Sequence, residues 1–216
     1  VIDQDNQLKV YKKEGKIVEL ERNVSHEAPN LLGYVGISHT RWATHGEPNE
    51  VNAHPHLDNE AKIAIVHNGI IENYKTLKHN LMNKGYLFKS ETDTEVLVHL
   101  IHYYYQTEKN LLKAVQKMLK VIEGTYGIAV IHQDHPDQII SARKGSPVIL
   151  AIGNDEFFIT SDINATIVHT KKVIYLEDGD IVKLTFDGYE IINNENQYIN
   201  PEVSEIDWDI SAIDKG

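Results

Sequence analysis

Cysteine is absent from the 216 residues, and methionine and tryptophan occur only twice each. Without cysteine the chain forms no disulfide bond, offers no thiolate to a metal ion and supplies no thiol nucleophile. These three kinds of chemistry are therefore excluded for the residues of this sequence.

Long apolar runs and an excess of basic residues are absent as well. No apolar stretch approaches the roughly 18 to 20 residues of a membrane-spanning helix, and residues 1–10 lack the basic and apolar regions of a signal peptide. Lys and Arg number 21 against 32 Asp and Glu, and the resulting net charge of −11 repels a phosphate backbone. We expect a soluble, cytoplasmic protein with no membrane and no nucleic-acid partner.

The residues that are present predict one domain with a sizeable core, because the apolar share is ordinary for a globular protein and no repeat or Pro/Ser-rich linker interrupts the chain. Near the start, alternation predicts a strand over 8–13 and a mostly buried strand over 33–40. A second buried strand, 61–69, is expected to close with a sharp turn at Asn68-Gly69.

Helices are expected in the middle of the chain. The segment "IIENYKTLKHNLMNKG" (70–85) places its apolar residues on one side of a helix that Gly85 ends. A capping-box pattern in "TDTE" (92–95) predicts the start of the next helix, and 110–124 repeats the helical spacing up to another glycine.

After residue 124 the apolar period becomes that of strands. Short β-rich runs are separated by Asp, Gly and Pro turns, which is typical of an antiparallel sheet. These runs cover 125–133, 137–145, 147–153, 156–162, 171–180, 181–188 and 189–194. Helices between strand-rich regions predict an α+β fold with two sheets faced by helices.

The stretch "HTRWATHGEPNEVNAHPH" (39–56) concentrates four histidines, an arginine and a tryptophan. A zinc site is one interpretation, but the histidine spacing matches no compact zinc motif, and we expect no metal. No Gly-x-Ser-x-Gly elbow supports a serine hydrolase, and no phosphate-binding glycine motif supports a nucleotide enzyme. Most of these histidines are interpreted as side chains that hold a polar loop in shape.

A clamp for a small zwitterion fits the pattern better. Arg41 offers a planar fork suited to a carboxylate, and Asp93, near a helix start, suits an ammonium group. Between them, the Asn68 carboxamide and the Gly69 N–H suit an oxyanion in acyl transfer. Each feature alone has an ordinary structural interpretation, and the hypothesis depends on their conjunction.

Three segments carry a resemblance to a known family: "GISHTRWATHGEPNEVNAHPH" (36–56), "IVHNGIIENY" (65–74) and "SETDTEVLVHLI" (90–101). They closely resemble the glutaminase domain of the glutamine:fructose-6-phosphate amidotransferases, a branch of the class II glutamine amidotransferases. "GTYGIAVI", "ARKGSPVIL" and the tail "DISAIDKG" are similar to later parts of that domain. The resemblance implies an N-terminal-nucleophile hydrolase fold, a four-layer αββα sandwich of two antiparallel sheets between helices.

The resemblance also implies residue roles. Arg41 would bind the α-carboxylate of L-glutamine and Asp93 its α-amino group, while Asn68 and Gly69 would form the oxyanion hole. No cofactor is implied. Ammonia would pass to a sugar isomerase domain beyond this chain, where fructose 6-phosphate becomes glucosamine 6-phosphate, and the full-length protein is expected to be a homo-oligomer.

Other residues of the histidine-rich stretch receive weaker assignments. The resemblance implies that Thr44 and His45 line the glutamine pocket and that Trp42 lies on the loop that closes over it. His54 and His56 receive no role in the reaction, and loop support is the favoured interpretation because a general base must reach the proton that it moves.

The family's nucleophile is an N-terminal cysteine thiol, which this sequence lacks. We therefore expect residues 1–205 to be a glutaminase domain without its first strand, residues 206–216 to be a tail or the start of a linker, and the chain as written to be inactive. A non-catalytic module that binds glutamine or mediates assembly is the alternative. An amidotransferase that makes a different product is a further one.

Overall fold

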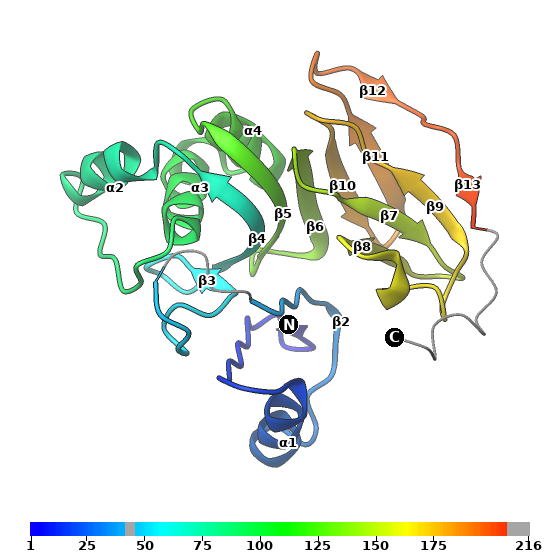
Figure 1. Cartoon of the computed structure of the whole chain (residues 1–216), viewed down its shortest axis with the longest axis horizontal. Coiled ribbons are helices and arrows are strands. Elements are labelled where there is room, and N and C mark those ends of the chain that lie inside the picture. Colours follow the sequence, from blue (N-terminus) through cyan, green and yellow to red (C-terminus); the bar gives the residue numbers. More distant parts are fainter. Residues whose placement is uncertain (42–45, 207–216) are drawn as a thin grey trace.

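The computed structural model describes residues 1–41 and 46–206 (Figure 1). The largest sheet in this part of the chain has seven antiparallel strands in the order β12-β11-β10-β6-β5-β4-β3. The strands are β3 (His56–Leu57), β4 (Ile63–Ile71), β5 (Gly124–His132), β6 (His135–Lys144), β10 (Ile181–Thr185), β11 (Gly188–Ile192) and β12 (Tyr198–Ile199).

Two smaller sheets accompany it. One has four antiparallel strands in the order β13-β9-β7-β8, and the other pairs two strands near the N-terminus. Their strands are β7 (Ile149–Ile152), β8 (Phe157–Thr160), β9 (Lys172–Tyr175) and β13 (Ser204–Glu205), and β1 (Ile2–Asp3) with β2 (Gly33–Val35). Each β-rich run predicted after residue 124 contains a strand, so that prediction is confirmed.

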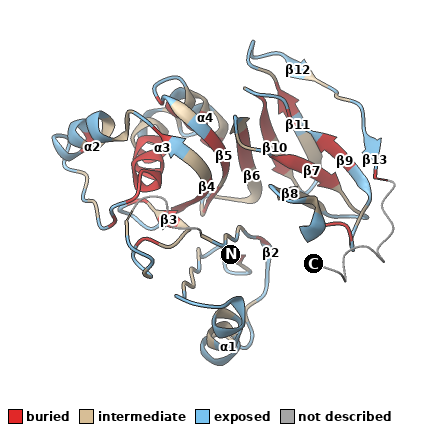
Figure 2. Cartoon of the chain, in the orientation of Figure 1, coloured by how far each residue is buried: buried red, intermediate tan, exposed pale blue. Residues whose placement is uncertain are grey.

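The described helices are α1 (Ile17–Glu27), α2 (Tyr74–Met82), α3 (Thr94–Glu108), α4 (Leu111–Leu119) and the short 3-10 helix η1 (Ile163–Ala165). Every residue of α3 from Thr94 to His102 is buried, whereas α1 buries none of its residues (Figure 2). The described part of the chain has no helix that is both apolar enough and long enough to span a membrane.

Alternating side chains of the strands separate the core into layers. On the helical side of the large sheet, Leu97 and Ile101 of α3 belong to one cluster with Ile63 and Ile65 of β4. Between the sheets, a second cluster is formed by Leu150, Ile174, Val182 and Leu184. A third covers the outer face of the four-stranded sheet with residues of and around η1, such as Ile163 and Ile167. The α+β class with two layered antiparallel sheets is confirmed.

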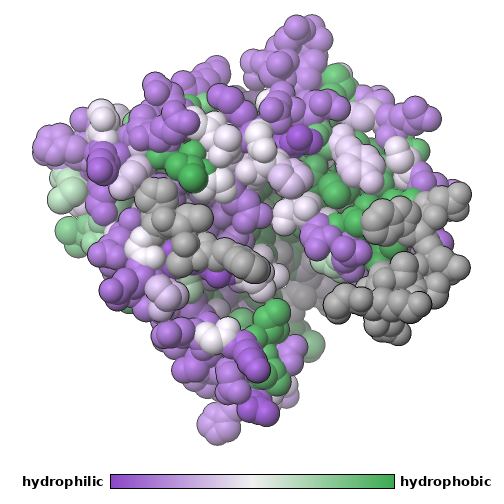
Figure 3. All heavy atoms as spheres, in the orientation of Figure 1, coloured by the Kyte–Doolittle hydropathy of each residue, from purple (hydrophilic) through white to green (hydrophobic). Residues whose placement is uncertain are grey.

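Predictions for the first 40 residues were largely wrong. Residues 8–13 form no strand, apart from a single bridge between Leu8 and Ile2, and the strand expected over 33–40 is confined to β2, of which only Val35 is buried. Helix α1 was not predicted. The segment around α1 exposes apolar side chains, including Leu32 and Tyr34, and forms the lower part of the surface in Figure 3. Periodicity reports burial, so a helix that buries nothing gives a poor signal.

The predicted Asn68-Gly69 turn is also wrong, because both residues lie inside β4 and pair in register with Gly127 and Tyr126 of β5. The strand continues to Ile71, and α2 therefore begins only at Tyr74 instead of residue 70. The last residue of α2, Met82, is exposed. Helix α4 ends at Leu119, before Gly124, where its end was expected.

The capping box at the start of α3 does not form. Asp93 is the N-cap residue, but its side chain bonds to no amide of the helix. It accepts a hydrogen bond from the N–H of Ile71 instead, and the carboxylate of Glu95 accepts bonds from Lys89 and Ser90. Tertiary contacts have taken both carboxylates that the pattern had assigned to the helix end.

Candidate active site

A pocket of about 160 Å³ lies where the end of β4 meets the start of α3 and the loop that follows β2. Its walls come from three stretches of chain, 39–41, 67–69 and 92–94, together with His54. The volume is several times the ~30 Å³ share of one water molecule, so a small polar molecule fits. Arg41, Asn68, Gly69 and Asp93, which the sequence proposed as one clamp, all line it.

The edge of β4 beyond β3 supplies backbone donors to this pocket. β3 pairs only with Ile65 and Ala64. Further along, the N–H of His67 donates to His54 Nδ1 at 3.3 Å, and the N–H of Ile71 donates to Asp93 Oδ2 at 2.8 Å. Because amides point to alternate sides of a strand, the N–H of Gly69 is directed to this same edge, between two amides that already have partners.

Gly69 is required by the backbone at this point. Its φ is +130°, and a Cβ added there would lie 2.3 Å from the carbonyl oxygen of Thr125 on the neighbouring β5. A side chain is therefore excluded by conformation and by contact together. The hydroxyl of Thr125 accepts the N–H of Ile70 at 3.2 Å, so β5 holds the irregular part of β4 in place.

Asn68 presents its carboxamide to a histidine of the preceding loop. Its Oδ1 lies 2.8 Å from His39 Nε2. The ring of His39 packs in turn against that of His54 at a tilt of 37°, with ring centroids 4.3 Å apart, and the ring of His54 lies 5.0 Å from that of His56. The histidines that sequence analysis grouped along the chain are therefore also neighbours in space.

Arg41 hydrogen-bonds to two backbone carbonyl groups a few residues further along the chain. Its guanidinium donates to the carbonyl oxygens of Gly46 and Glu47, each at 3.3 Å. The planar fork is thereby held at the wall of the pocket. Three other predicted pocket residues, Trp42, Thr44 and His45, lie outside the described residues.

Asp93 lies in the part of the pocket wall that residues 92–94 form. The residue is 4% exposed, and one of its oxygens is fixed by Ile71 as described above. A carboxylate has acceptor capacity for several more hydrogen bonds, and an ammonium group is a donor that matches it. Asp93 therefore joins the start of α3 to the strand that carries Gly69.

Burial favours the neutral form of three histidines around the pocket, His54, His56 and His67. His54 uses Nδ1 to accept the N–H of His67, and its pKa is lowered mainly by burial and further by the neighbouring histidines. Burial likewise lowers the pKa of His56 to about 3 and lowers the pKa of His67, whose Nδ1 lies 3.0 Å from the hydroxyl of Thr94. These contacts agree with loop support for His54 and His56. Among the described residues no group of three His, Asp or Glu is placed to hold a metal ion.

Sequence reasoning missed a chain of hydrogen bonds that adjoins the pocket, and one of its members, Thr92, lines the pocket. It runs from His56 Nε2 to Thr92 Oγ1 at 3.0 Å, on to Ser90 Oγ at 3.0 Å, and then to Glu95 Oε2 at 2.7 Å. All of its members are buried. The capping-box pattern covered only Thr92 and Glu95 and assigned them to the helix end, and His56 was expected to support its loop.

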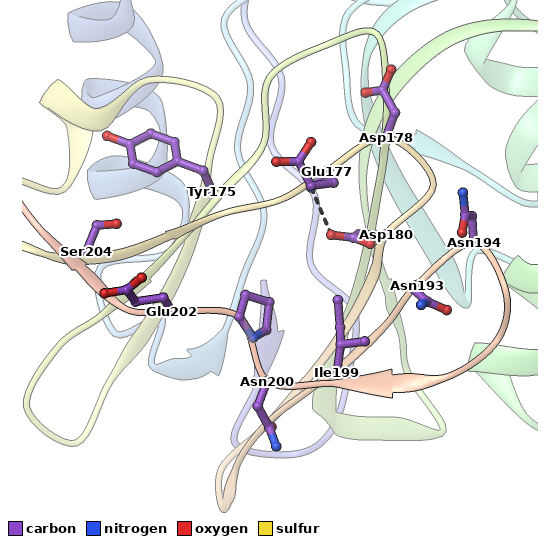
Figure 4. A pocket seen from close by; sticks show the side chains of 11 residues that line it. Tyr175, Glu177, Asp178, Asp180, Asn193, Asn194, Ile199, Asn200, Glu202 and Ser204 are labelled. Carbon is purple, nitrogen blue, oxygen red and sulfur yellow. Dashed lines mark hydrogen bonds between the residues drawn. The ribbon is translucent and has the colours of Figure 1, made fainter.

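A larger hollow of about 500 Å³ lies elsewhere, between the ends of β9, β11 and β12 (Figure 4). The carboxylates of Glu177, Asp178 and Asp180 gather on one of its sides, where the N–H of Glu177 donates to Asp180 at 2.8 Å. Its lining residues all lie between 175 and 204. Nothing in it combines a cation, an anion and a polar amide as the first pocket does.

Fold comparison identifies the class of protein. The structure of the glutamine phosphoribosylpyrophosphate amidotransferase of B. subtilis is similar to this fold with a TM-score of 0.72 and 24% identity, covering 89% of this chain and 41% of that one. The structure of an allosteric regulatory enzyme of purine biosynthesis gives a TM-score of 0.69 and 26% identity over 83% of this chain and 39% of that one. The fold is that of the N-terminal-nucleophile hydrolase type amidotransferases.

The family follows from the sequence. The model of the glutamine amidotransferase domain matches residues 39–167, and the chain belongs to this family. The matched range contains every residue that lines the pocket between β4 and α3 and none that lines the larger hollow.

Curated relatives narrow the comparison. The chain is 48% identical to a glutamine–fructose-6-phosphate aminotransferase (isomerizing) of Bacteroides thetaiotaomicron, over all of this chain and 35% of the relative. It is 46% identical to the enzyme of the same name from Thermotoga maritima, over 96% of this chain and 34% of the relative. The chain spans about a third of the length of these relatives. The resemblance stated from the sequence is confirmed.

Proposed function

We propose that this chain is the glutamine-hydrolysing part of a longer glutamine–fructose-6-phosphate aminotransferase. In that enzyme L-glutamine yields glutamate and ammonia, and the ammonia is passed to fructose 6-phosphate to give glucosamine 6-phosphate. The single observation that carries the proposal is the convergence of Arg41, Asn68, Gly69 and Asp93 on one pocket. The names of relatives up to 48% identical support the choice of sugar acceptor.

Different walls of the pocket bind different groups of the substrate. Arg41 binds the α-carboxylate, and Asp93 binds the α-ammonium group. The carboxamide lies near the edge of β4, where the Asn68 side chain and the Gly69 N–H donate to the oxygen that becomes negative. Fixed donors of this kind stabilise the transition state because they need no reorganisation as charge develops.

The nucleophile comes from outside these residues. The family resemblance assigns it to a cysteine thiolate, which attacks the carboxamide carbon of glutamine. Ammonia leaves as the tetrahedral intermediate collapses to a thioester, and water then releases glutamate and the thiol. A chain with no cysteine cannot carry out the first step, and we expect it to release no glutamate by itself.

The full-length protein has the following proposed domains, assembly and location. Residues 1–205 form the glutaminase unit, and 206–216 form a tail or begin a linker to a sugar isomerase domain. The full-length enzyme is a homo-oligomer of the cytoplasm and uses no cofactor in glutamine hydrolysis. Binding by Trp42, Thr44 and His45 is proposed on the family resemblance alone.

Glutamine hydrolysis by the full-length protein that carries this chain tests the proposal. Asn68→Ala removes one oxyanion donor, and we expect kcat to fall by about 10² to 10³ with little change in KM. The exposed Asn80 of α2 provides a matched control, Asn80→Ala, with kcat unchanged. An unaltered kcat in Asn68→Ala would remove the oxyanion hole from the proposal.

A non-catalytic module that binds glutamine or mediates assembly is the second candidate, and the absence of cysteine favours it. Titration calorimetry with the chain, combined with glutamate release by the full-length protein, separates the two. Binding by the chain without any turnover by the full-length protein would support the module.

A further inference from the structure

The orientation of the Asn68 side chain decides whether the pocket holds a donor or an acceptor. A carboxamide has a donor end, Nδ2, and an acceptor end, Oδ1, on the same carbon. In this structure Oδ1 lies 2.8 Å from His39 Nε2. If the amide were rotated by 180°, the acceptor would lie in the pocket and would repel a developing oxyanion.

The partner of Oδ1 fixes that orientation only if the proton of His39 is on Nε2. The other ring nitrogen, Nδ1, is buried and has no hydrogen-bond partner among the residues that the structure describes. Burying an unpaired N–H is rarer and more costly than burying an unpaired acceptor. The neutral ring is therefore expected to leave Nδ1 without a proton and to donate from Nε2 to Asn68.

The surroundings keep His39 neutral and in place. Burial lowers its pKa, the contacts with Asn68 and with the backbone of His67 oppose this effect, and the positive charge of Arg41 adds to it. The ring also packs on His54 at a centroid distance of 4.3 Å. His54 in turn is held by the backbone of His67, so the donor atom is supported from the strand that carries Asn68 itself.

We propose that His39 is a positioning residue that donates from Nε2 to Asn68 Oδ1 and so turns the Nδ2 donor of Asn68 towards the substrate. The inference rests on the proposed function, since it concerns the donor that stabilises the oxyanion. His39 itself touches no reacting atom. Its effect is to select one of the two orientations of the carboxamide before the substrate binds.

A double-mutant cycle in the full-length enzyme tests the inference. His39→Leu removes the donor, and we expect kcat for glutamine hydrolysis to fall by about 10- to 100-fold, less than for loss of the Asn68 side chain. KM should change by less than about threefold. His39→Gln, which offers an amide N–H in place of Nε2, should restore most of kcat. His79→Leu on the exposed face of α2 is the matched control, with unchanged kcat.

The cycle is completed by Asn68→Ala. In that background His39→Leu should lower kcat no further, because there is no carboxamide left to orient. An equal loss in both backgrounds would overturn the positioning role and leave the proposed function standing. A normal kcat in Asn68→Ala alone would instead overturn the oxyanion hole, so the two failures are distinguishable.

The ring nitrogen of His39 that carries the proton can be identified without any substitution. Nitrogen-15 chemical shifts of the imidazole in the wild-type protein distinguish the two neutral tautomers, and they apply even if His39→Leu does not fold. A protonated Nε2 and an unprotonated Nδ1 are expected at pH 7. A proton on Nδ1 would overturn the inference, because Nε2 would then accept from the amide and turn Oδ1 to the pocket.

Discussion

Glu95 offers a test of how the pocket is held together. The residue is 4% exposed, and its carboxylate accepts hydrogen bonds from the N–H of Lys89 at 2.8 Å, the N–H of Ser90 at 2.6 Å and the hydroxyl of Ser90 at 2.7 Å. Burial by itself would raise its pKa. The nearby ring of His99 and these hydrogen bonds outweigh burial and lower the pKa to about 2.

The stabilisation follows from that pKa. A fall from the ordinary 4.5 to about 2 corresponds to roughly 3 kcal/mol at about 1.4 kcal/mol per pKa unit. A carboxyl group with a depressed pKa contributes this stability in full above pH 4.5 and loses it as the pH falls through its folded value. Because domains are stable by only about 5 to 15 kcal/mol, the contribution of Glu95 is a large share.

Glu95→Gln keeps the size of the side chain but replaces one acceptor oxygen with an NH₂ that faces a backbone donor. We expect the free energy of unfolding at pH 7 to drop by about 3 kcal/mol. The difference from wild type should shrink between pH 4.5 and pH 2. Urea unfolding of the chain, followed by circular dichroism at several pH values, measures both effects.

The control for this experiment is Glu72→Gln, at an exposed carboxylate next to β4, which should leave the unfolding curve unchanged at every pH. The reasoning is refuted if Glu95→Gln costs less than about 1 kcal/mol at pH 7. It is refuted equally if the difference between variant and wild type does not depend on pH below 4.5.

Two further predictions concern the pocket. Arg41→Lys in the full-length enzyme should raise KM for glutamine by about tenfold or more with kcat within about threefold, because a lysine cannot form the two parallel bonds of a guanidinium to a carboxylate; steady-state kinetics with an unchanged KM would contradict the clamp. Gly69→Ala should destabilise the chain in urea by about 2 to 4 kcal/mol, since strain at positive φ is joined by the contact with Thr125. Gly85→Ala, also at positive φ but with open space around its Cβ, should cost at least about 1 kcal/mol less, and equal losses would show that the contact with Thr125 is unimportant.

Sequence reasoning was most successful where side chains are buried with a regular period. Adjacent residues of β10, β7 and β9 belong to apolar clusters on opposite sides of their sheet, as Ile181 and Val182 of β10 do, so the pattern was visible without any structure. The same reasoning failed at α1, which buries none of its residues. It also failed at the capping-box pattern, because Asp93 and Glu95 bond to groups outside the helix that they begin.

The residues of the pocket were predictable from their types, whereas their arrangement was not. Asn68-Gly69 is a common turn signal, and no local rule predicts a glycine at positive φ within a paired strand. That strand aligns the amides of 67, 69 and 71 along one edge. The hydrogen bond to His39 was invisible too, because it joins residues 29 positions apart whose approach depends on the path of the chain between them.

The spacing of the backbone amides along β4 also bears on which amino acid the proposed site accepts. Asp93 accepts a hydrogen bond from the amide of Ile71, and the amide of Gly69, the proposed oxyanion donor, lies two residues away on the same strand. A strand advances about 3.3 Å per residue, so the amides of Gly69 and Ile71 lie about 7 Å apart. An amino acid whose ammonium group is bound at Asp93 would bring its side-chain carbonyl to the Gly69 amide only if its carbon chain had the right length. The selection of one amino acid over a shorter homologue would then depend on the backbone spacing along β4 together with the Asp93 carboxylate that is bonded to it.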